Sequence, residues 1–212
     1  MRLTKYSHAC VRVERDGAVL VIDPGAFTEP EALDGADAVL VTHQHFDHLD
    51  VQKLADALAR RPAITVHTHP DVVPQLGALD GVVHPVRSGE RFQAAGFEVQ
   101  AFGGWHARIH PDIERVVNLG FLVEDADGSV YHPGDSFDVP AGAQVETLFV
   151  PISGPWLKLA ESVDFVRAVA PRRAYALHDS LLSEAGGRVH DATLAQLAGC
   201  DYQRLAPGST VE

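Results

Sequence analysis

The chain has 212 residues, of which 46% are hydrophobic and 22% are charged, a composition that excludes an intrinsically disordered protein. Its 17 basic and 29 acidic residues give a formal net charge of −12. This balance disfavours a nucleic-acid backbone as the main partner, because phosphate binding needs a basic surface. No apolar run approaches the roughly eighteen residues that span a bilayer, so no membrane partner is expected.

The N-terminal stretch and the cysteines favour a cytoplasmic protein. Residues 1–17 include basic side chains but neither a continuous apolar core nor a small-residue cleavage site, so we expect no targeting segment. Cys10 and Cys200 stand near opposite ends of the chain, and two reduced thiols are expected rather than one disulfide.

The first half of the chain is predicted to form short strands that lead into one helix. Strands are expected over residues 2–7, 9–15, 18–23 and 38–41. Asp16-Gly17 is typical of a hairpin turn between the second and third of these strands. Residues 26–37 are expected to form a loop. The apolar positions of residues 51–60 have helical spacing, and Asp50 is well placed to cap that helix.

The second half alternates further strands with helices. Strands are expected over 63–67, 82–86, 92–102 with a break at Gly96, 118–124, 129–132, 147–152 and 173–177, and helices over 71–76, 161–169 and 191–197. Asp127-Gly128 is predicted to form a second hairpin turn. Many short strands with helices between them indicate an α/β fold, in which functional residues collect beyond strand ends.

One such strand end carries a dense cluster of polar residues. The apolar run 38–41 stops at Thr42, and His43, His45, Asp47 and His48 follow within six residues. A tight loop with this spacing can turn imidazole nitrogens and a carboxylate toward one or two small centres. Neutral imidazole together with carboxylate suits zinc, iron or manganese better than calcium or magnesium. The sequence therefore predicts a transition-metal site here.

Four separated residues are candidates to join this cluster. His106, His110, Asp135 and His178 each follow a predicted apolar strand within a few residues. His106 and His110 share one loop, so the residues alone leave open which of the two is the ligand. Seven ligands shared between two metal ions would give each ion a nearly complete set.

The segment His43-Gln44-His45-Phe46-Asp47-His48 matches the HxHxDH signature of the metallo-β-lactamase superfamily of binuclear metal hydrolases. The later His106, Gly134-Asp135 and His178 follow in that superfamily's order. The SHACVRVE opening and the short chain most resemble its lactonase-like branch, which includes ascorbate-6-phosphate lactonase. The resemblance implies a four-layer αββα sandwich that forms a single domain over residues 1–212.

The resemblance also implies a ligand set. His43, His45 and His106 would hold the first metal ion, and Asp47, His48 and His178 the second, with Asp135 bridging the two. His106 is favoured over His110 because it lies nearer the strand end and follows paired glycines. Two divalent ions are expected, zinc first, with manganese and iron as alternatives.

The implied activity is hydrolysis of an ester-type bond, in a lactone or a phosphoester, within a small molecule. Two divalent ions about 3.5–4 Å apart lower the pKa of a bridging water from roughly 15.7 to about 7, and the resulting hydroxide attacks the substrate. Asp47 would both bind a metal ion and orient this hydroxide. Alternatives are a phosphodiesterase or nuclease, a thioesterase, or a non-catalytic metal-binding protein.

Other polar residues are candidates for supporting roles. We expect His8, His132 and Asp179 to support the ligands from behind, and Trp156, Lys158 and His110 to contact the substrate. Lys158 and Arg108 are the natural anion contacts if the substrate is phosphorylated. A small-molecule substrate is the expected partner, and the branch resemblance is compatible with a homo-oligomer.

Overall fold

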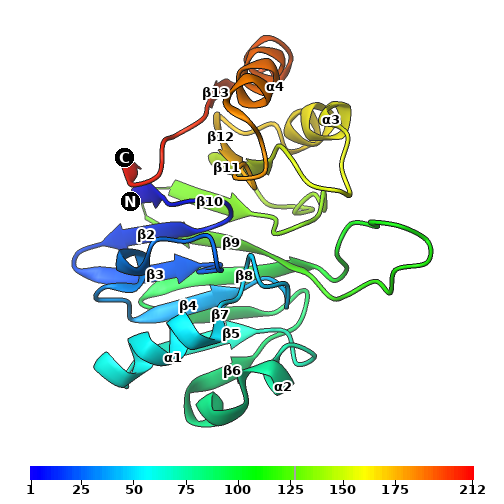
Figure 1. Cartoon of the computed structure of the whole chain (residues 1–212). Coiled ribbons are helices and arrows are strands. Elements are labelled where there is room, and N and C mark those ends of the chain that lie inside the picture. The colour runs from blue at the N-terminus through cyan, green and yellow to red at the C-terminus, as the bar shows by residue number, and fades with distance from the viewer. Residues whose placement is uncertain (127) are drawn as a thin grey trace.

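The computed structural model describes residues 1–126 and 128–212, which form two seven-stranded sheets packed face to face (Figure 1). The first sheet contains, from edge to edge, β14 (Ser209–Val211), β1 (Arg2–Lys5), β2 (Val11–Arg15), β3 (Ala18–Ile22), β4 (Ala38–Val41), β5 (Thr65–Thr68) and β6 (Val83–Pro85). The second contains β13 (Asp201–Gln203), β12 (Arg173–Leu177), β11 (Thr147–Pro151), β10 (Gly128–His132), β9 (Leu119–Asp125), β8 (Phe97–Gly103) and β7 (Arg91–Ala94).

Each sheet joins an antiparallel part to a parallel part. The strands β1, β2 and β3 form an antiparallel meander, after which β4, β5 and β6 run parallel to β3. The predicted turn Asp16-Gly17 is confirmed, with both residues in the left-handed region at φ 52° and 85°. The strands β7 to β10 are antiparallel, and β11 to β13 then add in parallel. The predicted turn Asp127-Gly128 falls partly outside the described residues, since Asp127 is not among them.

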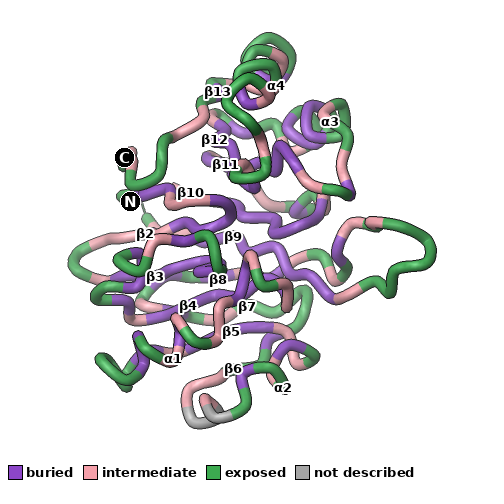
Figure 2. The backbone as a smooth tube through the Cα atoms, in the orientation of Figure 1, coloured by how far each residue is buried: buried purple, intermediate pink, exposed green. Residues whose placement is uncertain are grey.

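The main core lies between the sheets. In β8, Phe97, Val99 and Ala101 are buried, whereas Glu98 between them is exposed, so the strand shows the alternation of a sheet with one apolar face. In contrast, every residue of β4 is buried, as expected for a central strand covered on both faces. Figure 2 shows buried residues along the central strands and exposed residues concentrated in the surrounding helices and loops.

Helices cover the outer face of each sheet. The helix α1 (Val51–Arg60) packs buried Leu54 and Leu58 on the first sheet, near α2 (Val73–Leu76) and the 3₁₀ turns η1 (Pro30–Leu33) and η2 (Gly77–Val82). Its predicted cap is confirmed, because Asp50 accepts a hydrogen bond from Lys53 N at 3.0 Å. The helices α3 (Leu159–Val169) and α4 (Glu184–Leu197) lie against the second sheet. The predicted αββα sandwich is therefore confirmed.

The sequence-based boundaries were wrong mainly near the C-terminus. The last helix begins at Glu184 rather than at residue 191, with the Ser183 side chain accepting a hydrogen bond from Gly186 N. Gly187 lies where a Cβ atom would come within 2.7 Å of the Arg204 guanidinium, so this glycine permits a close approach instead of ending the helix. The edge strands β13 and β14 were not predicted, and η1 interrupts the loop expected over 26–37. No helix of the described chain is long and apolar enough to cross a membrane.

Candidate metal centre

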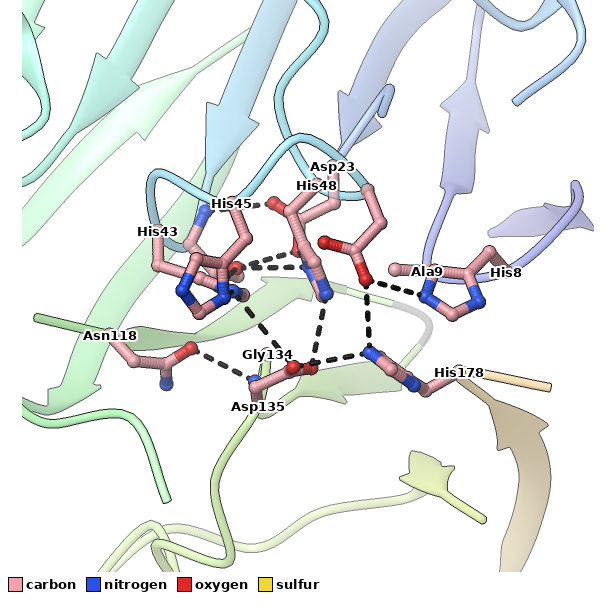
Figure 3. A network of polar contacts seen from close by, with 12 residues as sticks. His8, Ala9, Asp23, His43, His45, His48, Asn118, Gly134, Asp135 and His178 are labelled. Atoms are coloured by element: carbon pink, nitrogen blue, oxygen red, sulfur yellow. Dashed lines mark hydrogen bonds and ion pairs between the residues drawn. The ribbon is translucent and has the colours of Figure 1, made fainter. Parts of the chain in front are cut away.

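Loops from both sheets converge at one edge of the sandwich, where several strands end (Figure 3). They bring together imidazole and carboxylate side chains that lie far apart in the sequence. These are His8 from the β1–β2 turn, His43, His45, Asp47 and His48 after β4, His106 after β8, Asp135 after β10 and His178 after β12. The parallel strands β4, β11 and β12 explain the convergence, because the carboxyl ends of parallel strands meet at one edge of a sheet.

The side chains form two groups of four potential ligands. In each group, ligand atoms from the four residues lie within 4.8 Å of one another. One group contains His43, His45, His106 and Asp135, and the other contains His8, Asp47, His48 and His178. The sequence placed His8 behind the ligands, whereas the structure places it among them. Its Nε2 atom lies 3.0 Å from Asp47 Oδ2.

Asp135 lies between the two groups. Its Oδ2 atom is 3.2 Å from His106 Nε2 and 3.1 Å from His178 Nε2, and its Oδ1 atom is 3.1 Å from His48 Nε2. One carboxylate thus contacts histidines of both groups. Asn118 fixes its backbone, because the amide oxygen of Asn118 accepts a hydrogen bond from Asp135 N at 2.9 Å. This is the position that a shared ligand of two cations needs.

The residues present fit divalent transition-metal ions. His43 Nε2 and His45 Nδ1 lie 3.0 Å apart. Two ring nitrogens therefore converge on one point, as two ligands of the same cation would. Among the described side chains, the buried atoms His48 Nε2, His178 Nε2 and Asp135 Oδ1 have close ionic contacts in this cluster, but none of these contacts has hydrogen-bond geometry. Buried polar atoms are normally satisfied, and a cation bound between these atoms would satisfy them.

The electrostatics of the cluster favour the ligand forms of both carboxylates and of His43, whereas at His178 the effect of burial is outweighed by Asp135, which raises the pKa to about 9. Burial would raise the pKa of Asp135, but His48 and His178 hold that pKa well below its usual value. Burial also opposes ionisation of Asp47, yet hydrogen bonds with His178 and His8 lower its pKa. Burial lowers the pKa of His43, and the neighbouring His48 lowers it further. At neutral pH both carboxylates are therefore ionised and His43 is neutral, as cation binding requires.

Asp23 is a supporting residue that the sequence analysis missed. It is fully buried and accepts hydrogen bonds from Thr42 N at 2.8 Å and from Thr42 Oγ1 at 2.6 Å, and its Oδ2 atom lies 2.6 Å from His48 Nδ1. A carboxylate on the far nitrogen of a ligating histidine fixes the orientation of the ring. The sequence did contain a signal, because Asp23 stands at the end of an apolar strand. However, the following Pro24 and Gly25 are typical of an ordinary turn, so Asp23 was interpreted as a turn residue.

The turn after β3 also supports the backbone of the ligand loop. A Cβ atom on Gly25 would lie 1.9 Å from the Asp47 carbonyl oxygen and 2.5 Å from His48 N. Only glycine permits so close an approach of two backbones. Ala26 N donates a hydrogen bond to Phe46 O at 2.8 Å, which holds the two segments together.

The other predicted supporting residues have different roles. His132 is buried, and its Nε2 atom lies 2.8 Å from Ala9 O while its Nδ1 atom accepts a hydrogen bond from Gly134 N at 3.2 Å, so it connects the turn that carries His8 with the turn that carries Asp135. Asp179 does not reach the cluster but pairs with Lys5 Nζ at 3.4 Å. Lys5 is buried, and burial lowers its pKa against the opposing effect of Asp179. The adjacent His178 is fixed through its backbone, since its N–H donates to His8 O at 3.0 Å and its carbonyl accepts from Ser153 Oγ.

A cleft of about 310 Å³ opens onto the cluster. Among the predicted substrate contacts, the structure brings Trp156 to this cleft, where its Nε1 atom donates to Asp135 Oδ2 at 3.0 Å. Lys158 is instead exposed at the start of α3, and its backbone N–H donates to Glu161. His110 is 60% exposed beside Asp112, so the structure brings His106 and not His110 to the cluster.

Comparisons with known proteins agree with this architecture. The pattern of the Beta-lactamase superfamily domain matches residues 2–178. Protein Rv0786c of Mycobacterium tuberculosis is 37% identical over 214 residues, covering 100% of this chain and 99% of the relative. The UPF0173 metal-dependent hydrolase MK1542 of Methanopyrus kandleri is 30% identical, covering 84% of each chain. The structure of Igni18, a metallo hydrolase from Ignicoccus hospitalis, superposes with a TM-score of 0.78 at 19% identity, covering 99% of this chain and 97% of that one. The chain therefore belongs to the metallo-β-lactamase superfamily.

Proposed function

We propose that this chain is a metal-dependent hydrolase that holds two divalent cations and cleaves an ester-type bond in a small molecule. The observation that carries the proposal is the position of Asp135, which contacts histidines of both four-residue groups at the floor of an open cleft. The relatives named as metal-dependent hydrolases support the metal dependence and the hydrolase activity. Zinc is the expected ion, with manganese or iron as alternatives that the same ligands accept.

The ligands divide between the two cations by position. His43, His45 and His106 would hold one ion, and Asp47, His48 and His178 the other, with Asp135 shared. His8 adjoins the second set through Asp47. Bound cations would supply Lewis acidity, which polarises a substrate oxygen and lowers the pKa of water.

The chain's own residues would orient this chemistry. Asp47 borders the cleft with 14% of its side chain exposed, and His8 holds its Oδ2 atom at 3.0 Å. Because its pKa is held well below the usual range by His178 and His8 against the effect of burial, Asp47 suits an orienting acceptor better than a general base. Asp23 holds His48, and Trp156 holds Asp135 while its ring faces the cleft.

The proposal is tested by reconstitution and a substrate panel. Protein stripped with a chelator is reloaded with Zn²⁺, Mn²⁺ or Fe²⁺ and assayed with lactones, carboxylic esters, thioesters and phosphodiesters. We expect turnover of an ester-type substrate that depends on added metal and is lost in Asp135→Asn. Turnover that persists in the stripped protein, or metal binding without any hydrolysis in the panel, would contradict the proposal.

A further inference from the structure

The walls of the cleft differ in character from its floor. The floor contributes His45, Asp47, His106, Asp135 and His178. The walls are apolar and come from separate loops, with the side chains of Phe27, Phe46, Ile109, Pro155, Trp156 and Leu181. A small site with an apolar wall and a few converging polar groups is the usual form of a small-molecule binding site.

Three of the wall residues expose apolar surface that the fold itself does not use. Phe46 is 66% exposed, Leu181 55% and Phe27 40%. Phe27 and Phe46 contact each other edge to face, with ring centroids 5.7 Å apart. Single exposed apolar residues are common, but apolar residues from three loops that line one cleft form a contiguous patch, and such patches mark binding sites.

The walls offer no partner for an anionic group. Among the described residues that line the cleft, none is lysine or arginine. The hydrogen-bond donor of Trp156 is already used by Asp135, so this residue presents its ring. Arg108 lies on the flank, where it lines a separate hollow of about 10 Å³ with His45 and His106, too small to hold a phosphate. Arg115 is engaged by the backbone oxygen of His106.

From these observations, and resting on the proposed hydrolase function, we infer that the substrate is an uncharged carboxylic ester or lactone whose substituent is apolar. Bound cations would supply positive charge at the floor, where it would face the reacting carbonyl. A phosphate or carboxylate elsewhere in the substrate would face Phe46, Leu181 and Phe27, and would lose hydration without gaining a partner. The phosphorylated substrate considered from the sequence is therefore disfavoured.

The kinetic test compares chain length with charge in the metal-loaded protein. p-Nitrophenyl acetate, butyrate and hexanoate form an apolar series, and the p-nitrophenyl monoester of adipic acid is a close anionic match to the hexanoate. We expect kcat/KM to rise by up to about fourfold for each added methylene, and the adipate monoester to react at least about tenfold more slowly than the hexanoate.

Three variants assign the effect to the walls. Phe46→Ala and Leu181→Ala should flatten the chain-length series, because they lower kcat/KM for the hexanoate more than for the acetate. Leu197→Ala removes a leucine that is 40% exposed on α4, outside the cleft, and should leave the whole series unchanged. The inference would be overturned if the wild type preferred the adipate monoester to the hexanoate. Loss of that preference in Arg108→Ala would identify Arg108 as the partner of the anionic group.

A binding measurement separates this inference from the proposed function. Saturation-transfer NMR with 2-butanone, 2-hexanone and 2-octanone reports occupancy of the cleft without any turnover. Affinity that rises along this series in the wild type but not in Phe46→Ala supports an apolar substrate even if hydrolysis fails. Metal-dependent hydrolysis with no chain-length dependence in either assay would leave the hydrolase intact and overturn the inference.

Discussion

The floor and the rim of the cleft are built in opposite ways. The floor, meaning the two groups of four potential ligands, is mostly buried, and hydrogen bonds hold it in place: Asp23 contacts His48, Trp156 donates to the Asp135 side chain, and Asn118 accepts from the Asp135 backbone. The rim, meaning Phe27, Phe46, Ile109 and Leu181, lies on loops and is largely exposed. The contrast teaches that the positions proposed for chemistry are held by buried hydrogen bonds, whereas the surface proposed to select a substrate consists of apolar side chains on loops.

The largest effect is expected where the two ligand groups meet. Asp135→Asn keeps the shape of the side chain but removes the charge that His48, His106 and His178 share. We expect loss of at least one metal ion per chain and a fall in kcat/KM on the order of 10³-fold, or about 4 kcal/mol. Elemental analysis and kinetics measure both. An unchanged circular dichroism spectrum serves as the control for folding. Full activity of Asp135→Asn would show that the floor is not needed for the reaction and would contradict the contrast between floor and rim.

The two histidines of the β8–β9 loop give the sharpest contrast within one segment. His106 Nε2 lies 3.2 Å from Asp135, whereas His110 is 60% exposed. His106→Ala should therefore lower metal content and reduce activity on the order of 10²-fold, while His110→Ala should do neither. Loss of metal from His110→Ala alone would reverse the assignment.

A residue behind the floor should have a smaller effect. Asp23→Asn replaces one acceptor by a donor facing Thr42 or His48, so the orientation of the His48 ring is no longer fixed. Metal affinity should fall by about 10- to 100-fold. Asp37→Asn is a matched control, because Asp37 also accepts a backbone hydrogen bond in the first sheet, from Val19 N at 2.9 Å, but contacts no ligand. Equal metal affinity in both variants would contradict the role of Asp23.

These contrasts also explain how much could be predicted from the sequence. The segment from His43 to His48 was identified because a buried strand and a short loop keep its side chains together locally. Their places after strands made His106, His110, Asp135 and His178 candidates, and the resemblance to the superfamily implied that His106, Asp135 and His178 are the ligands. Asp23 was missed because its role depends on sheet register.

The register in question cannot be derived from the local sequence. The strands β3 and β4 are parallel neighbours with Ile22 opposite Leu40, which places Asp23 beside Thr42. Similarly, the apolar residues of the rim form no periodic pattern in the sequence, because they come from four separate loops. The last helix was predicted too short for a comparable reason. Gly186 and Gly187 looked like a break in the helix, but Gly187 provides room for the Arg204 side chain, which comes from another segment of the chain.

A buried histidine outside the floor should behave differently from the ligands. Among the described residues His67 has no carboxylate partner. Its ring stacks with those of His84 and Phe92, and burial, with a smaller effect of His84, lowers its pKa to about 4. Below about pH 6.5 the unfolded chain binds a proton that the folded chain does not, so stability falls as the pH drops toward 4.

The variant His67→Gln removes this dependence. Between pH 7.5 and 5.0 in the presence of chelator, the free energy of unfolding should fall by about 2 kcal/mol less in His67→Gln than in the wild type. Urea denaturation at the two pH values gives the difference, and His110→Gln controls for removal of a surface histidine. Parallel losses in His67→Gln and the wild type would refute the assignment.

The smallest effect is expected at the rim. Phe46 is 66% exposed, so Phe46→Ala should change the free energy of unfolding by no more than about 0.5 kcal/mol and leave metal content unchanged. Thermal unfolding and elemental analysis are the measurements. A large loss of stability or of metal would mean that the rim is part of the floor's support.

The most direct measurement is the metal content of the stripped and reloaded chain. After incubation with Zn²⁺ and removal of the excess, our prediction is about two zinc ions per wild-type chain and fewer in Asp135→Asn. A folded wild-type chain that retains no zinc would contradict it, because the buried histidines and carboxylates would then hold one another rather than a pair of cations.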